Sequence, residues 1–299
     1  MQGLLLLNKP KGITSFSAVS KIKRIAGEKR VGHTGTLDPM ASGVLPIFIG
    51  RATALSQYLL DADKRYTAKI KLGVVTDTAD ITGTVLAETQ VSVDDGLIEQ
   101  TLKTFLGKQM QTPPMYSAIK KDGVRLYSLA REGKTVEIEP REITVHSIEK
   151  TSDLNRDNEF CIAVSVSKGT YIRSLCTDIG KALGCGATLS GLIRTQTAGF
   201  NLADCVDLDD ITPENIGEFL RPSDSAVGYM KKLSVTEKQG VRFSNGGQLY
   251  LDRLKGEKLE DNETCRVYCG ETFLGIGRAD FSKNWLCIGC LVQQIKNGG

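Results

Sequence analysis

One loop of the sequence gathers side chains that could perform acid–base or covalent chemistry. Residues 31–46 hold Asp38 directly before Pro39, with His33 five positions earlier and three glycines among them. Glycine lets a backbone approach a ligand closely, and Pro39 favours an extended conformation for Asp38. A phosphate-binding loop is disfavoured because the Gly-Lys-Ser/Thr ending is absent. Spacing alone leaves two interpretations open, a structural turn in which Asp38 bonds to nearby amides and a working carboxylate.

Strands and helices without a regular β-α-β rhythm surround this loop. The pattern predicts strands at 3–7, 44–49, 66–72 and 160–166, and helices at 14–27, 95–107 and from about 172 to 183. In the first helix, Phe16, Val19, Ile22 and Ile25 recur every three residues and predict its apolar face. This interleaving predicts an α+β fold with a mixed, largely antiparallel sheet.

The character of the sequence changes near residue 230. Short strands with glycine-rich turns follow one another there, and helical periodicity is confined to a segment near 235–242. That pattern predicts a small β-barrel. With roughly 100–200 residues per domain, we expect two domains, at 1–229 and 230–299.

Charge is concentrated at the N-terminal end of the chain. The 299 residues carry a net charge of only +3, but residues 1–30 hold seven basic side chains against the single acid Glu28. These are Lys9, Lys11, Lys21, Lys23, Arg24, Lys29 and Arg30. Such a region suits a phosphate-rich partner, although a solvated basic helix is the simpler alternative on composition alone.

The eight cysteines and the apolar runs indicate a protein of the cytoplasm without a metal. The pairs Cys265/Cys269 and Cys287/Cys290 have the spacing of a zinc ribbon. The first pair alternates with polar residues as in a strand, and the second lies in an apolar run, so we expect core thiols. The apolar run 4–7 is too short for a signal peptide, and no run approaches a membrane span.

Seven motifs follow one another in order across residues 3–230. They are Asn8-Lys9-Pro10-x-Gly12-x-Thr14-Ser15, Gly32-His33-x-Gly35-x-Leu37-Asp38-Pro39-x-Ala41-x-Gly43-x-Leu45-Pro46, Lys64-Arg65-Tyr66, Thr76-Asp77-Thr78-x-Asp80, Gln111-x-Pro113-Pro114-x-Tyr116-Ser117-Ala118, Gly123-x-Arg125-x-Tyr127 and Gly169-Thr170-Tyr171-Ile172-Arg173-Ser174-Leu175. In these motifs and their order, the sequence resembles the bacterial TruB family, the tRNA pseudouridine-55 synthases. The C-terminal part resembles the family's PUA-like RNA-binding domain more loosely. The resemblance therefore implies a pseudouridine synthase core followed by a PUA-like domain.

The resemblance implies an isomerase that converts uridine 55 in the T loop of tRNA to pseudouridine without cofactor or metal. Asp38 matches the nucleophile, which attacks uracil C6 or ribose C1′. Arg173 matches the basic residue that keeps it ionised. Tyr66 matches the tyrosine that stacks on the flipped base and takes part in proton transfer at C5.

Further positions match substrate-binding residues of the family. Tyr171 and Leu192 correspond to pocket residues that hold the flipped nucleotide. His33 corresponds to an RNA contact, which we favour over a general base. Lys9 and Lys11 are expected to hold tRNA phosphates at the mouth of the site, with binding that weakens as salt rises.

Two alternatives use the same scaffold. One is a tRNA-binding or folding factor without catalysis, against which the intact set of Asp38, Tyr66 and Arg173 argues. The other is a guide-RNA-dependent relative that works within a protein–RNA particle, which the insertion around 84–150 and the compact C-terminal end disfavour. We expect a monomer that recognises the T arm of tRNA and needs no protein partner.

Overall fold

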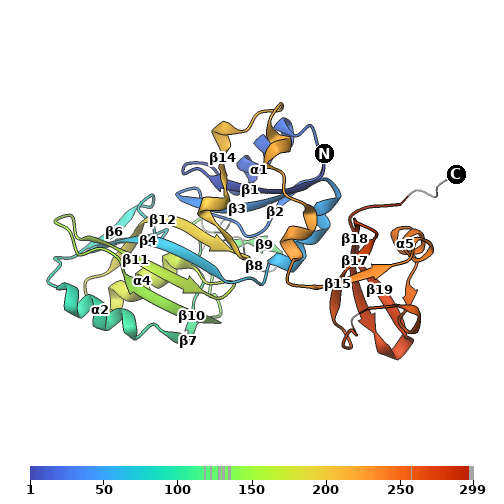
Figure 1. Cartoon of the computed structure of the whole chain (residues 1–299). Helices are drawn as coiled ribbons and strands as arrows, with labels where there is room; N and C mark the ends of the chain where they lie inside the picture. Colours follow the sequence, from blue (N-terminus) through green and yellow to red (C-terminus); the bar gives the residue numbers. More distant parts are fainter. Residues whose placement is uncertain are drawn as a thin grey trace.

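The computed structural model shows two large sheets with helices packed on them, and two small two-stranded sheets (Figure 1). It describes residues 1–117, 119–121, 123–126, 129, 132–133, 136–256 and 258–295. The motif residues Ala118 and Tyr127 lie outside the described residues. Across the described part of the chain, no helix is long and apolar enough to cross a membrane.

A ten-stranded sheet forms the larger part of the molecule. Its strands are β1 (Gly3–Lys9), β2 (Val31–His33), β3 (Ala41–Ile49), β4 (Lys64–Leu72), β7 (Gly107–Gln111), β10 (Arg141–Lys150), β11 (Glu159–Val166), β12 (Ala187–Thr197), β13 (Phe200–Asn201) and β14 (Val206–Asp207). They follow the order β14-β1-β3-β12-β4-β11-β10-β7, with β2 on β3 and β13 on β12. The pairs β1–β14 and β3–β12 are parallel and the others antiparallel. The expected mixed α+β fold is confirmed.

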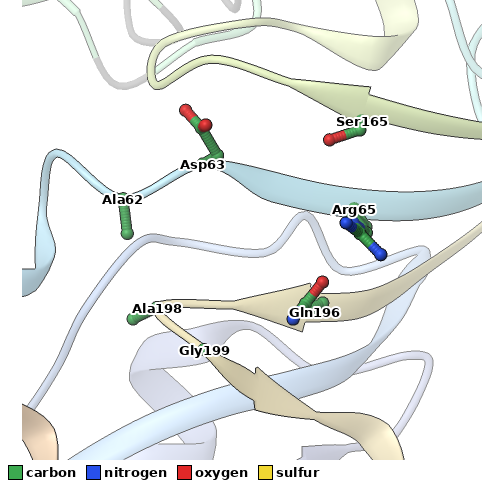
Figure 2. A pocket seen from close by; sticks show the side chains of 7 residues that line it. All are labelled: Ala62, Asp63, Arg65, Ser165, Gln196, Ala198 and Gly199. Carbon is green, nitrogen blue, oxygen red and sulfur yellow. The ribbon is translucent and has the colours of Figure 1, made fainter. Parts of the chain in front are cut away.

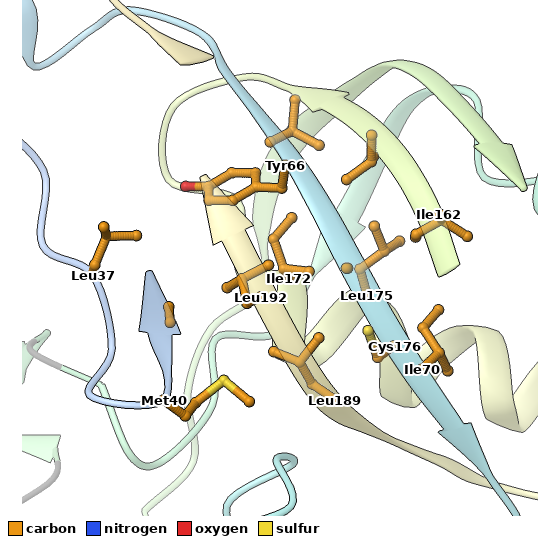
Figure 3. Close-up of a cluster of buried hydrophobic side chains, with 14 of the residues drawn as sticks. Leu37, Met40, Tyr66, Ile70, Ile162, Ile172, Leu175, Cys176, Leu189 and Leu192 are labelled. Atoms are coloured by element: carbon orange, nitrogen blue, oxygen red, sulfur yellow. The ribbon is translucent and has the colours of Figure 1, made fainter. Parts of the chain in front are cut away.

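Three helices pack against one face of this sheet. They are α1 (Ser15–Ile25), α2 (Asp95–Lys103) and α4 (Ile172–Ala182). Figure 3 shows Leu175 and Cys176 of α4 against Ile70 and Ile162 of the sheet. The helix α2 is shorter than predicted, because Gly107, with φ +91, opens β7.

The apolar face of helix α1 differs from the predicted one at Phe16. Thr14 caps its start by accepting a hydrogen bond from the Ser17 N–H. Ala18, Val19 and Ile22 point into the core, whereas Phe16 is 77% exposed. The buried face of a helix is formed by residues three and four positions apart. Ala18 and Ile22, four apart, lie at its centre and Val19 beside them. Phe16 is spaced three residues from Val19 but lies outside this face. The prediction that Phe16 belongs to the buried face was therefore wrong.

Shorter elements connect the main ones. The strands are β5 (Val74–Thr76), β6 (Val85–Glu88), β8 (Lys120–Lys121) and β9 (Val124–Arg125), in two hairpins. The 3₁₀ helices are η1 (Gly50–Leu59), η2 (Leu202–Asp204), η3 (Leu208–Asp210), η4 (Ile216–Phe219), η5 (Ser223–Val227), η6 (Leu251–Arg253) and η7 (Phe281–Lys283).

The C-terminal part forms a second, five-stranded sheet. Its elements are β15 (Lys231–Val235), α5 (Glu237–Ser244), β16 (Leu249–Tyr250), β17 (Thr264–Cys269), β18 (Thr272–Asp280) and β19 (Trp285–Leu291). The order β15-β17-β18-β19-β16 leaves β15 and β16 at opposite edges, so the curled sheet is a half-barrel (Figure 1). Cys265 and Cys290 are buried in it, and all eight cysteines are free thiols.

The two sheets share one apolar cluster. Leu4, Val44 and Phe48 of the first sheet belong to it together with Phe273 and Ile276 of the second. Polar contacts run beside this cluster. The Arg266 Nε donates to the Met230 carbonyl at 3.0 Å, and the Tyr268 hydroxyl donates to Asp224. The boundary expected at 229/230 falls between η5 and β15, and the division into two domains stays a prediction.

The close packing of α4 on β12 generates a stability prediction. A Cβ on Gly180 would lie 2.2 Å from the Ala187 nitrogen. Gly180→Ala should therefore lower the free energy of unfolding by about 1–3 kcal/mol through overpacking, against a helix-propensity gain of roughly 1 kcal/mol. Urea denaturation followed by circular dichroism measures this. Gly217→Ala, whose Cβ would meet open space, is the control, and equal midpoints for both variants would contradict the prediction.

Candidate active site

Asp38 lies in the loop between β2 and β3, and the start of α1 holds this loop in place. The buried Ser15 hydroxyl accepts from the Leu37 N–H at 2.8 Å and donates to the Leu37 carbonyl at 3.1 Å. The Gly12 N–H donates to the Pro39 carbonyl at 2.7 Å. Backbone contacts on both sides of Asp38 therefore fix where its side chain starts.

Arg173, in the first turn of α4, faces Asp38. Its Nε lies 2.9 Å from Asp38 Oδ2, an ion-pair contact not aligned as a hydrogen bond, and its Nη2 donates to Oδ1 at 3.3 Å. The guanidinium also donates to the carbonyls of Tyr116 at 2.8 Å and Thr78 at 3.1 Å. The Arg173 side chain is 5% exposed, whereas that of Asp38 is 36% exposed. The two backbone carbonyls thus fix the arginine, while the Asp38 carboxylate stays accessible to a ligand.

A second carboxylate, which the sequence interpretation did not assign to the site, lies on the far side of Arg173. Asp80 Oδ2 is 3.9 Å from Arg173 Nη1. Asp80 also belongs to a local turn, in which its Oδ1 accepts from the Thr78 hydroxyl at 3.0 Å and from the Thr82 N–H at 2.9 Å. The pairing with Arg173 joins residues distant in sequence, so the turn motif alone could not reveal it.

The surroundings of Asp38 act on its pKa in opposite directions. Burial is the largest cause and raises the pKa of Asp38 above its usual value, and the charge of Asp80 adds to the increase. Arg173, through its charge and its hydrogen bond, and Lys9, through its charge, lower the pKa. Burial wins, so the carboxyl keeps its proton to a higher pH than a free aspartic acid.

Tyr66 and Arg194 come from adjacent strands beside the loop. Figure 3 shows the Tyr66 ring above Leu192, with its hydroxyl directed toward the Leu37 side of the site. The Arg194 residue, 1% exposed, is the cross-strand neighbour of Tyr66. Its guanidinium donates from Nη2 to the Gly35 carbonyl at 3.0 Å and from Nε to the Val44 carbonyl at 2.8 Å. Arg194 therefore ties the loop to β3 beside the tyrosine.

The structure contradicts the exposed position that we expected for Lys9. This residue is fully buried, and its ammonium donates to the carbonyls of Pro10 at 2.8 Å and Ile13 at 2.7 Å. Burial lowers the pKa of Lys9 to about 8, while the charge of Asp38 acts in the opposite direction. Lys9 ends a core strand and folds its side chain back onto the following turn, so it cannot reach a phosphate at the surface. Lys11 is exposed as expected.

The remaining predicted residues surround the same loop. His33 is half-buried, its Nδ1 has no hydrogen-bond partner among the described residues, and burial lowers its pKa. Tyr171 precedes α4, and its backbone N–H and carbonyl are both bonded to the Gln111 amide, at 2.8 and 3.1 Å. Leu192 on β12 is buried in the core beside Tyr66.

A shallow hollow of about 200 Å³ is separate from this site (Figure 2). It is lined by Ala62, Asp63, Arg65, Ser165, Gln196, Ala198 and Gly199. Arg65 and Tyr66 are consecutive on β4 and point to opposite faces of the sheet. Within the part of the chain that the structure describes, no group of three or more His, Cys, Asp or Glu side chains could hold a metal ion.

Family models match most of the chain. The model described as TruB family pseudouridylate synthase (N terminal domain) matches residues 23–172, and the tRNA pseudouridylate synthase B C-terminal domain matches 173–228. The class defined by these matches is that of the pseudouridylate synthases.

Curated relatives extend the match to nearly the full length. The chain is 43% identical over 282 residues to tRNA pseudouridine synthase B of Clostridium perfringens, covering 94% of this chain and 96% of the relative. It is 44% identical to the protein of that name from Clostridium tetani, covering 93% and 96%. The chain belongs to the TruB family.

Solved structures show the same fold. A Cbf5-Nop10-Gar1 complex contains a chain with a TM-score of 0.70 and 27% identity, covering 98% of this chain and 84% of that one. The archaeal box H/ACA sRNP Nop10-Cbf5 complex gives a TM-score of 0.72 at 24% identity, covering 98% and 86%. Both likenesses span the two sheets.

Arg194 generates a prediction as a positioning residue. Arg194→Lys keeps the charge but cannot reproduce the planar set of donors to the Gly35 and Val44 carbonyls. We expect kcat for pseudouridine formation to fall about 100-fold through misplacement of the loop, with KM for RNA little changed. Steady-state kinetics and thermal unfolding separate this from lost stability. Arg221→Lys, at a half-exposed ion pair with Asp204, is the control, and equal kcat in the two variants would contradict the assignment.

Proposed function

We propose that this protein converts uridine 55 in the T loop of tRNA to pseudouridine, with Asp38 as the nucleophile. The observation that carries the proposal is the partly exposed Asp38 carboxylate held against the buried Arg173 guanidinium. The names of the relatives support tRNA as the substrate. Two features support Asp38 as the reacting group: its side chain is accessible, and a fixed cation opposes its protonation.

The chemistry needs a carboxylate and a confined base. The N1–C1′ bond of the uridine breaks, the uracil turns, a C5–C1′ bond forms, and the C5 proton leaves while N1 gains one. Asp38 supports this by forming a covalent adduct at uracil C6 or at ribose C1′ and leaving again. The substrate uridine must leave its stack to reach Asp38 in the loop.

Neighbouring side chains supply the other requirements. Tyr66 stacks on the extruded uracil and takes part in proton transfer at C5, with Arg194 as its cross-strand neighbour. Tyr171 and Leu192 form walls of the base pocket. His33 contacts the RNA, and its unpartnered, buried Nδ1 suits a hydrogen bond made on binding.

The exposed basic residues of the N-terminal region contact the RNA phosphates. Lys11 lies in the turn before α1, and Lys21, Lys23 and Arg24 are exposed along the helix. Lys9 has no phosphate contact in this proposal. Its buried ammonium instead holds the turn that adjoins the Asp38 loop. The partner is the T arm of tRNA, recognised by shape and by splayed bases.

Replacing the nucleophile tests the proposal directly. Asp38→Asn should abolish tritium release from tRNA transcript labelled at uridine C5, because the amide cannot act as the nucleophile. Binding of the transcript should stay within about tenfold, since Asp38 carries none of the phosphate contacts that dominate affinity. Asp38→Asn with wild-type turnover would sink the assignment. Wild-type protein that releases no tritium without added guide RNA or protein partners would instead favour one of the two alternatives.

The pKa balance at Asp38 predicts a shifted pH profile. The active form is the carboxylate, so activity is lost as pH falls through the pKa of Asp38. Removing the guanidinium in Arg173→Gln takes away an influence that lowers this pKa. The acidic limb of kcat/KM should therefore move to higher pH by about one unit or more. Tritium release between pH 5 and 9 measures it, with the exposed Lys181→Gln on the same helix as control. An unmoved limb would argue against the pairing.

A further inference from the structure

Among the described residues, Phe16 carries a strongly exposed aromatic ring beside the nucleophile loop. A single exposed apolar side chain is ordinary on a protein surface. The Phe16 ring, however, is 77% exposed at the start of a helix whose own apolar face is filled by Ala18, Val19 and Ile22. Packing inside the molecule therefore does not account for a phenylalanine at this position.

The helix carrying Phe16 is attached directly to the catalytic loop. Ser15, the residue before Phe16, exchanges two hydrogen bonds with the backbone of Leu37, next to Asp38. The Thr14 cap fixes the first turn of the helix. The aromatic ring is thus held at a set position relative to the nucleophile.

Exposed basic side chains follow Phe16 along α1 and just after it. Lys23 and Arg24 lie seven and eight residues further along α1, on the same side of the helix as Phe16. Lys21 on α1 and Lys29 and Arg30 after it are also exposed, and no ion pair of these five side chains is found within the described residues. Glu28, the single acid of the first 30 residues, is engaged by the N-terminal ammonium. The charge of this surface is free to meet phosphates.

We infer that Phe16 is a stacking platform for an unpaired base of the substrate RNA, with the basic side chains of α1 holding the flanking phosphates. An aromatic ring among cations is the combination that binds unstacked nucleotides, because every base offers a π-face and its backbone a negative charge. The inference rests on the proposed function. It adds a contact outside the base pocket that fixes how the RNA enters it.

Substitutions at Phe16 test the inference on the full-length protein. Phe16→Ala should weaken binding of unmodified tRNA transcript about tenfold and raise KM similarly, with kcat little changed, since stacking on one ring contributes to binding of the RNA. Phe16→Tyr should restore affinity. Phe281→Ala, at another exposed phenylalanine in the second sheet, is the matched control. Phe16→Ala with wild-type affinity, or an equal loss in both alanine variants, would overturn the inference.

Fluorescence reports the stacking itself. The chain has a single tryptophan, Trp285, so Phe16→Trp adds one emitter at the proposed platform. Stacking of a base on the new indole should quench it on tRNA addition, beyond the change of the wild-type protein. Absence of extra quenching at saturating tRNA would overturn the inference. If wild-type protein converted no uridine in tRNA, the proposed function would fail, whereas normal conversion with an unaffected Phe16→Ala would remove only the platform.

Discussion

Removing the Asp38 carboxylate from water is the constraint on which the architecture of the site depends. Burial raises the pKa of Asp38, and a cation beside the carboxylate is needed to oppose this rise. Arg173 is itself buried and needs partners for its remaining donors. Backbone carbonyls of Thr78 and Tyr116 and the Asp80 carboxylate provide them. One carboxylate thereby requires four segments of the chain to meet.

The loop that carries Asp38 is held by backbone contacts. The Ser15 hydroxyl hydrogen-bonds the Leu37 backbone, and the Arg194 guanidinium donates to the Gly35 carbonyl. The Gly12 N–H donates to the Pro39 carbonyl. Gly43 allows Arg194 to come close, since a Cβ there would lie 2.2 Å from the Arg194 carbonyl oxygen. Because the anchors come from the turn after β1, from α1 and from β12, the loop is fixed to the core of the sheet, which is what a positioned nucleophile requires.

Local patterns predicted the elements, and ordered motifs indicated the site residues, but contacts between distant segments could not be read from either. The cap at Thr14 and the strand at 66–72 are encoded by adjacent residues. The Asp80–Arg173 pair depends on how the turn between β5 and β6 meets α4 in space. Lys9 illustrates the limit, because a lysine after a strand is exposed by default, and only the turn carbonyls that receive its ammonium explain its burial. Phe16 was assigned to the wrong face because residues spaced every three positions drift around a helix of 3.6 residues per turn. Such a spacing therefore does not decide which of them are buried.

The apolar cluster shared by the two sheets limits how the chain can be truncated or recombined. Leu4, Val44 and Phe48 are covered partly by residues of the second sheet, among them Phe273 and Ile276. A protein cut before β15 would present those side chains to water and become prone to self-association. A chimera between two relatives would have to exchange the cluster residues of both sheets together. The C-terminal sheet is therefore not a module that can be exchanged without the surface of the first sheet on which it packs.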